Sequence, residues 1–168
     1  MTETEAHRNR LVDHLAGLAQ REDRATLALL RGTLHEGRRL DGLPIVLPFV
    51  TAQDRFRDRA EDDALLLAGL FALHPEPGPY SLASALRIVS QTSDSVELRF
   101  RALLSASRED LPAHLRHAVS LVAGHGIALD YRDLHAAIRF WGSDRTRRQW
   151  ARAFWTPDHT GETTERSA

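Results

Sequence analysis

Apolar residues recur at helical spacing along most of this 168-residue chain. In its first segment Leu11, Leu15 and Leu18 lie three or four residues apart, so they share one face of a helix. No stretch alternates apolar and polar residues for long enough to build a sheet. The pattern therefore predicts an all-α fold, a compact bundle of about eight helices.

Helix boundaries follow from capping residues and from breakers. Four residues suit N-cap positions and one glycine suits a helix end: Thr4, Asp23, Ser81, Ser143 and Gly37. The predicted helices are Glu5–Gln20, Arg24–Glu36, 52–73, Leu82–Ser90, Ser95–Ser105, one from Asp110 to Gly124 or Gly126, Asp130–Trp141, and one that follows Ser143 and ends at Trp155. The run Ala64–Leu73 is apolar nearly all round, so its helix is expected at the centre of the fold.

Residues 74–80, His-Pro-Glu-Pro-Gly-Pro-Tyr, form the densest cluster of breakers in the chain. The cluster separates an apolar helix from a fresh serine cap, which favours a boundary between two packed lobes. The predicted division is an N-terminal helical lobe over 1–73, a connector over 74–80, a C-terminal helical lobe with a basic surface over 81–155, and a disordered tail over 156–168.

Composition limits the cellular compartment and the kinds of binding site that this chain can have. The chain has no cysteine, which excludes disulfides and thiolate metal sites and favours a cytoplasmic location. No apolar run is long enough for a membrane span, and the opening Thr-Glu-Thr-Glu argues against a signal peptide. All 22 basic residues are arginine, whose planar, permanently charged guanidinium suits phosphate.

The net charge of −1 is spread unevenly. Residues 1–80 carry ten arginines against thirteen acids, whereas residues 81–155 carry eleven against seven. The tail 156–168 has one arginine and three acids. A uniformly basic coat is thus excluded, and a local basic track in the second half remains open.

Arginines beside the apolar stripes are the candidate nucleic-acid-binding residues. In the last helix, Arg145, Arg148 and Arg152 lie three and four residues apart on one side. The full set of candidates is Arg24, Arg31, Arg99, Arg101, Arg116, Arg145, Arg148 and Arg152. Packing of the helices could gather these flanks into one groove. The alternative is that they are only the solvated faces of amphipathic helices.

No catalytic or metal-binding constellation is found. His114 and His117 are three apart on a helix and His125 follows in the next loop, but no Glu-x-x-His or His-Glu-x-x-His pattern supplies the remaining ligands. The cluster Glu61-Asp62-Asp63 is interpreted as a solvated helix start. A Gly-x-Ser-x-Gly turn and a Gly-rich phosphate loop are also missing. We therefore expect no metal, no cofactor and no enzymatic activity.

Aromatic residues cluster near the C-terminus and could stack on bases. They are Phe140, Trp141, Trp150, Phe154 and Trp155. Helical spacing favours the hydrophobic core for most of them.

The order of segments resembles the CasB family, the small subunit of the type I-E CRISPR surveillance complex, Cascade. Together the matching segments cover most of residues 23–155. They are D-R-A-T-L-A-L-L-R-G at Asp23–Gly32, F-A-L-H-P at Phe71–Pro75, S-L-A-S-A-L-R at Ser81–Arg87, L-R-F-R-A-L-L at Leu98–Leu104, L-P-A-H-L-R-H-A-V at Leu111–Val119, and the closing R-R-Q-W-A-R-A-F-W.

The resemblance implies a non-catalytic, all-helical subunit, present in two copies, that holds the guide–target hybrid and the displaced strand through a basic surface. Its implied partners are other Cascade subunits, a second copy of itself, guide RNA and target DNA, with no membrane and no small-molecule substrate. Carried onto matching positions, the basic residues are Arg31, Arg99, Arg101, Arg116 and Arg148. Gly32 and His117 stand where the family often has further basic residues, so the implied phosphate track is thinner.

Other classes of protein compete with this interpretation. The main alternative is a helical interaction or scaffold subunit whose arginines pair with acidic partner surfaces and never contact nucleic acid. A helix-turn-helix regulator is disfavoured, since no short recognition helix follows a glycine turn of the right length. A continuous positive groove would favour nucleic acid, whereas scattered arginine–acid pairs would favour the scaffold.

Overall fold

A computed structural model describes residues 2–156 and confirms the all-α class. Within that range it contains nine α-helices, two short 3-10 helices (η1 and η2) and one short strand. In chain order these are α1 Glu3–Gln20, α2 Arg24–Gly32, η1 Glu36–Gly42, α3 Leu43–Val46, η2 Leu47–Phe49, α4 Arg57–Leu73, β1 Pro77–Tyr80, α5 Leu82–Ser90, α6 Ser95–Leu104, α7 Leu111–Gly124, α8 Tyr131–Arg139 and α9 Asp144–Trp155.

Most predicted caps are confirmed. The side chains of Asp23, Ser81 and Ser143 each accept a backbone N–H from the first turn of α2, α5 and α9. The assignment to Thr4 was wrong, because Thr2 caps α1 by accepting the Glu5 N–H at 3.2 Å.

The predicted end of the second helix at Gly37 was also wrong, since α2 ends at Gly32. Thr33 closes its last turn: the hydroxyl donates to the Leu30 carbonyl at 2.6 Å, and the Thr33 N–H donates to the same oxygen at 3.1 Å. This i→i−3 geometry tightens the helix end. Gly37 instead lies within η1.

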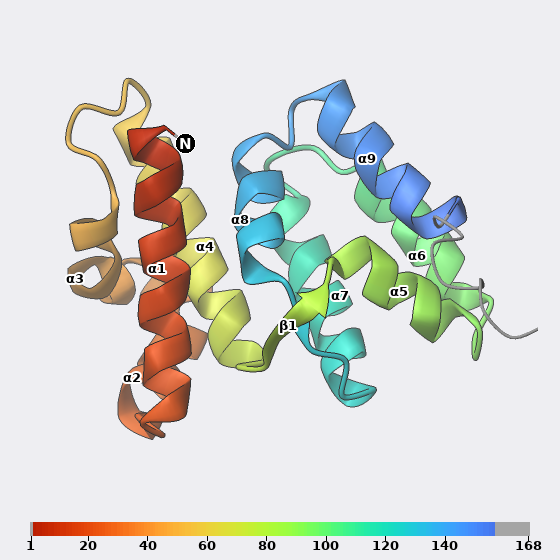
Figure 1. The fold of residues 1–168 in the computed structure, drawn as a ribbon, viewed down its shortest axis with the longest axis horizontal. Coiled ribbons are helices and arrows are strands. Elements are labelled where there is room, and N and C mark those ends of the chain that lie inside the picture. Colours follow the sequence, from red (N-terminus) through yellow and green to blue (C-terminus); the bar gives the residue numbers. More distant parts are fainter. Residues whose placement is uncertain (1, 157–168) are drawn as a thin grey trace, which may run out of the picture.

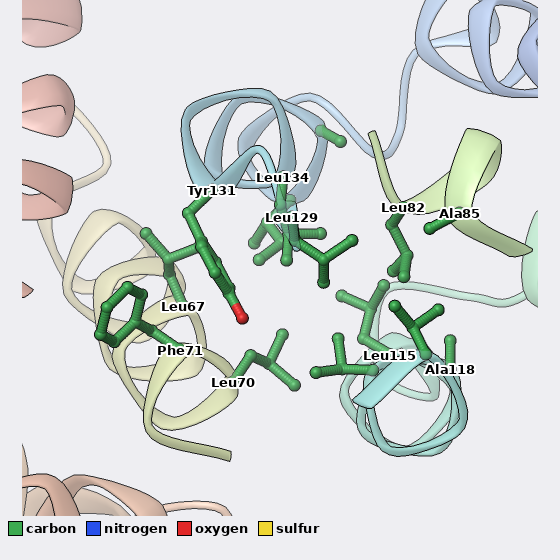
Figure 2. Close-up of a cluster of buried hydrophobic side chains, with 14 of the residues drawn as sticks. Leu67, Leu70, Phe71, Leu82, Ala85, Leu115, Ala118, Leu129, Tyr131 and Leu134 are labelled. Atoms are coloured by element: carbon green, nitrogen blue, oxygen red, sulfur yellow. The ribbon is translucent and has the colours of Figure 1, made fainter. Parts of the chain in front are cut away.

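Helix α4 is central, as its sequence predicts (Figure 1). It packs against α2 and α3 on one side and against α7 and α8 on the other. The part of α4 from Asp63 to Ala72 is almost wholly buried. In Figure 2, Leu67, Leu70 and Phe71 of α4 meet side chains from α5, α7 and α8, including Tyr131. The Phe71 and Tyr131 rings contact edge to face, with centroids 4.8 Å apart.

Residues 74–80 are not helical, and several hydrogen bonds hold them in place. The Leu129 N–H donates to the backbone carbonyl of Glu76 at 2.9 Å, and the Asp130 N–H donates to the backbone carbonyl of Tyr80 at 2.7 Å. These bonds form parallel bridges between β1 and Leu129. The division of the chain into two lobes stays a prediction. The predicted tail falls outside the described residues, apart from Thr156.

Gly78 makes the close approach of β1 to Ala128 possible. A Cβ at position 78 would lie 2.4 Å from the Ala128 Cβ and 3.1 Å from its carbonyl carbon. We expect Gly78→Ala to lower the free energy of unfolding by about 1–3 kcal/mol through overpacking. Chemical denaturation measures this. Gly124→Ala is the matched control, because nothing lies within 4 Å of a Cβ there. An equal effect in both variants would contradict the prediction.

Candidate nucleic-acid interface

All eight candidate arginines are exposed. They project from four helices, with Arg24 and Arg31 on α2, Arg99 and Arg101 on α6, Arg116 on α7, and the remaining three on α9. Among the ion pairs formed within residues 2–156, only Arg101 of this set takes part: its Nη2 lies 2.7 Å from Glu97. Most of the candidates are therefore free of internal charge partners in the described chain and available to an external anion.

Helix α7 forms a wall common to two surface hollows. The first hollow, of about 410 Å³, lies between α5, α6 and α7 and contains Arg99, His114 and His117 at its rim. The second, of about 670 Å³, lies between α4, α7 and the segment that follows α2, and contains Arg116. His117 lines both. The structure thus brings two candidates from different helices to adjacent hollows.

The second hollow also contains three arginines that the sequence interpretation missed. Arg39 comes from η1, Arg59 from α4, and Arg108 from the loop before α7. Arg39 and Arg59 lie in charge-dense stretches, and periodicity gives no sign that these stretches face α7. Exposed acids share the hollow, namely Glu36, Asp62 and Glu109. Its charge is therefore mixed, with Arg39 lying 3.6 Å from Asp62.

Other candidates lie apart from α7. Arg145 lines a separate hollow together with Asp133 and Gln149. The Arg101 guanidinium lies over the Trp155 ring, 4.9 Å from its centroid. In Figure 1, α2 and α9 lie toward opposite ends of the molecule. A single surface shared by all eight residues stays a prediction.

Two arginines counted toward the basic C-terminal segment serve the fold instead. Arg139 Nη2 donates to both carboxylate oxygens of Asp54, at 2.9 and 2.8 Å, and only 14% of its side chain is exposed. Arg147 donates to the carbonyls of Trp141 and Ala106 at 3.2 and 3.3 Å. Fewer arginines of this segment are therefore available to an external anion.

Asp63 corrects the interpretation of Glu61-Asp62-Asp63 as a solvated helix start. It is 5% exposed, pairs with Arg108, and lies 3.6 Å from Arg139 Nη1. Burial raises the pKa of the Asp63 carboxyl, while the charges of Arg108 and Arg139 oppose the rise. The interpretation failed because these partners lie far away in the sequence.

The prediction that most of the C-terminal aromatic residues belong to the core is confirmed. Trp141, Trp150 and Phe154 are buried, whereas Phe140 and Trp155 are 51% and 39% exposed. Trp141 and Trp150 contact edge to face with centroids 5.0 Å apart. The Trp155 side chain is therefore partly exposed at the surface, beside Arg101.

The histidines differ in environment. His135 is buried, and burial, with Arg8 next in effect, lowers its pKa to about 3. Within residues 2–156, no three His, Cys, Asp or Glu residues gather closely enough to hold a metal ion. In the same range, no helix combines the length and apolarity needed to cross a membrane.

His135 leads us to expect a loss of stability in acid. The unfolded chain binds its proton near pH 6.5, whereas the folded protein binds it only near pH 3. The contribution of His135 to the free energy of unfolding is therefore complete above pH 6.5. It falls as the pH drops from 6.5 toward 3, by up to about 1.4 kcal/mol per pH unit. The raised pKa values of buried Asp63 and Asp133 act in the opposite direction at acidic pH.

Denaturation of wild type and His135→Gln between pH 7 and 4 isolates the histidine. The variant should show a shallower loss of stability toward acid. Parallel curves for the two proteins would exclude this role.

The fold and surface together define an all-helical protein whose arginines face solvent from several helices. Residues 23–155 match the family model for CRISPR-associated protein Cse2, and the chain belongs to that family. The CRISPR-associated protein Cse2 of Thermus thermophilus is 36% identical over 119 residues, which cover 67% of each chain.

Solved structures agree with this assignment. A CRISPR-associated protein of the Cse2 family from T. thermophilus is 30% identical, with a TM-score of 0.73 over 92% of this chain and 99% of its own. CasB from M. ruber is 27% identical, with a TM-score of 0.70 over 90% and 93%. A chain of a CRISPR RNA-guided surveillance complex, 21% identical with a TM-score of 0.71 over 90% and 92%, shares the fold.

Proposed function

We propose that this chain is the small, non-catalytic subunit of a CRISPR RNA-guided surveillance complex, and that its arginines hold the phosphate backbone of the guide–target hybrid and the displaced strand. The observation that carries the proposal is the convergence of Arg39, Arg59, Arg99 and Arg116 on two hollows that share α7. We call these four residues the α7 arginines. They come from four different elements, η1, α4, α6 and α7.

The proposed role is electrostatic. Exchange of a DNA duplex for a guide–target hybrid is nearly balanced in free energy, so contacts that hold the displaced strand can tip it. Arginine contacts with phosphate carry no sequence information, which suits a subunit that must accept any target. Guanidinium groups about one hydrogen-bond length from phosphate oxygens would supply charge-assisted bonds.

His117 bears on the strength of the proposed contact. It lines both hollows. It also occupies a position where family members often have a basic residue. Gly32 offers no side chain, and the Arg38 guanidinium fills the space beside it, 3.1 Å from where a Cβ would be. These differences support weak binding by the isolated subunit, with the rest of the complex supplying further contacts.

Protein partners form part of the proposal. Large apolar side chains are exposed on three separate elements, with Leu40 on η1, Phe56 before α4 and Leu98 on α6. Leu98 is the most exposed of the three, at 71%. We assign these surfaces to other Cascade subunits and to a second copy of the chain.

A retardation assay tests the nucleic-acid proposal. The purified chain is titrated against single-stranded DNA, duplex DNA and an RNA–DNA hybrid of unrelated sequences over a salt series. We expect similar affinities for different sequences and a linear fall of log K with log salt concentration. Absence of binding even at low salt, with the chain still entering the assembled complex, would favour the scaffold alternative.

A further inference from the structure

Three buried polar atoms that lack a hydrogen-bond partner in the protein line one small cavity. They are Thr51 Oγ1, Asp63 Oδ2 and His135 Nδ1. Within residues 2–156, four buried side-chain N or O atoms lack such a partner, so three of the four gather at this one place. Buried polar groups of folded proteins are nearly always hydrogen-bonded, so a cluster of exceptions indicates a bound polar ligand.

The cavity limits the size of that ligand. It has a volume of about 20 Å³ and lies between α1, α4, α8 and the segment that joins η2 to α4. Thr51 belongs to this segment, Asp63 to α4 and His135 to α8. A buried water needs about 10–15 Å³ and two to four polar partners. The cavity therefore has room for one water molecule.

The charges around the cavity favour a neutral occupant over an ion. Among its described lining residues, Arg8 and Arg139 are balanced by Asp54 and Asp63. His135 adds no charge at neutral pH, because burial lowers its pKa to about 3. A cation or an anion in the cavity would upset this balance, whereas water would not.

Asp63 requires a hydrogen-bond donor from the occupant. Its Oδ1 already accepts from Arg108, while its Oδ2 lies 3.6 Å from Arg139 Nη1, just beyond the range of a direct hydrogen bond. Polar groups at such a separation can be joined by a bridging water.

His135 also requires a donor. A backbone hydrogen bond with Arg8 raises the pKa of His135, which is the effect of a carbonyl oxygen that accepts from a ring N–H. Because Nδ1 has no partner in the described chain, this N–H belongs to Nε2. The neutral ring then carries its lone pair on Nδ1. The Thr51 hydroxyl, by contrast, is able to donate.

We propose that the cavity binds one structural water, which donates to Asp63 Oδ2 and His135 Nδ1 and accepts from the Thr51 hydroxyl. The site is independent of nucleic-acid binding. The water ties residues 50–56 to α4 and α8. The same segment presents the exposed Phe56, whose N–H donates to Asp54 Oδ1 at 2.9 Å. The water thus helps to fix one of the apolar side chains assigned above to protein partners.

A high-resolution crystal structure of the full chain tests the site. We expect one water peak at about 2.7–3.2 Å from each of the three atoms. Crystals grown with bromide in place of chloride identify a halide by its anomalous signal. A halide or a metal ion in the cavity, direct contacts among the three side chains, or a cavity without density overturns the proposal.

Nuclear magnetic resonance tests the hydrogen-bond pattern in solution. Long-range ¹H–¹⁵N correlation spectra at neutral pH should show His135 with its proton on Nε2. A nuclear Overhauser effect between water and the Thr51 methyl protons should show a long-lived water. A proton on Nδ1, or no transfer from water to Thr51, overturns the assigned pattern.

Thr51→Val removes the hydroxyl and keeps the shape of the side chain. The unfolding equilibrium constant should rise about 2- to 10-fold, as expected for the loss of one hydrogen bond. Thr146→Val, at a partly buried position on α9, is the control and should change it less. Thr51→Ser retains the hydroxyl and should also lose less than Thr51→Val. An unchanged constant in Thr51→Val, or equal losses in the two Thr51 variants, overturns the role of the hydroxyl.

Discussion

Replacement of Arg139 by alanine should lower the free energy of unfolding by about 3–5 kcal/mol. Arg139 is the shared partner of two buried carboxylates: the side chains of Asp54 and Asp63 are 8% and 6% exposed. Removal of the guanidinium leaves both without this partner in a poorly solvated position. A buried charge that loses its partner costs far more than the pair contributed when intact.

Urea denaturation at neutral pH measures this loss. Arg132→Ala is the matched control, because Arg132 pairs with Asp13 across a surface where both side chains are more than half exposed. That variant should lose no more than about 1 kcal/mol. Comparable losses in the two variants would show that Arg139 acts only as a surface charge.

Joint removal of the α7 arginines should reduce nucleic-acid binding by about 100-fold or more at low salt, and should lower the slope of log K against log salt by about three. Each guanidinium that neutralises one phosphate contributes somewhat less than one unit to that slope. The loss should be similar for all sequences, because phosphate contacts do not distinguish bases. Stability should change little, since these side chains are exposed.

The control variant removes the same charge from elsewhere on the surface. In this variant, four exposed arginines outside the candidate set are replaced by alanine: Arg10, Arg21, Arg55 and Arg132. A second comparison removes Arg145, Arg148 and Arg152 from α9. If the control weakens binding as much as the α7 variant does, binding reflects net charge alone and the local site is wrong.

Local signals in the sequence predicted the helices well. The stripe of Leu11, Leu15 and Leu18 and the cap at Asp23 depend on residues within one or two turns of each other, so the sequence of that segment contains them fully. The end of α2 was missed because Thr33 can stop a helix through its hydroxyl without any glycine. The central position of α4 was predictable because its second half is apolar on nearly all sides.

The roles of individual arginines could not be predicted in the same way. Arg139 and Arg148 both flank apolar stripes, yet the first lies against Asp54 while the second is exposed. What separates them is a partner 85 residues away, which periodicity does not register. Arg39 and Arg59 were missed for the same reason, because their neighbour α7 comes much later in the chain.

The hydrogen bonds between residues 74–80 and the start of α8 have a consequence for the geometry of the interface. Helices α5, α6 and α7 follow Tyr80 in the chain and end before Leu129, so the pairing of β1 with Leu129 joins the two ends of this excursion. Arg99 and Arg116 lie on the excursion, whereas Arg39 and Arg59 lie outside it. The close approach of Gly78 to Ala128, together with the packing of α7 on α4, therefore fixes the span between the two pairs of charges.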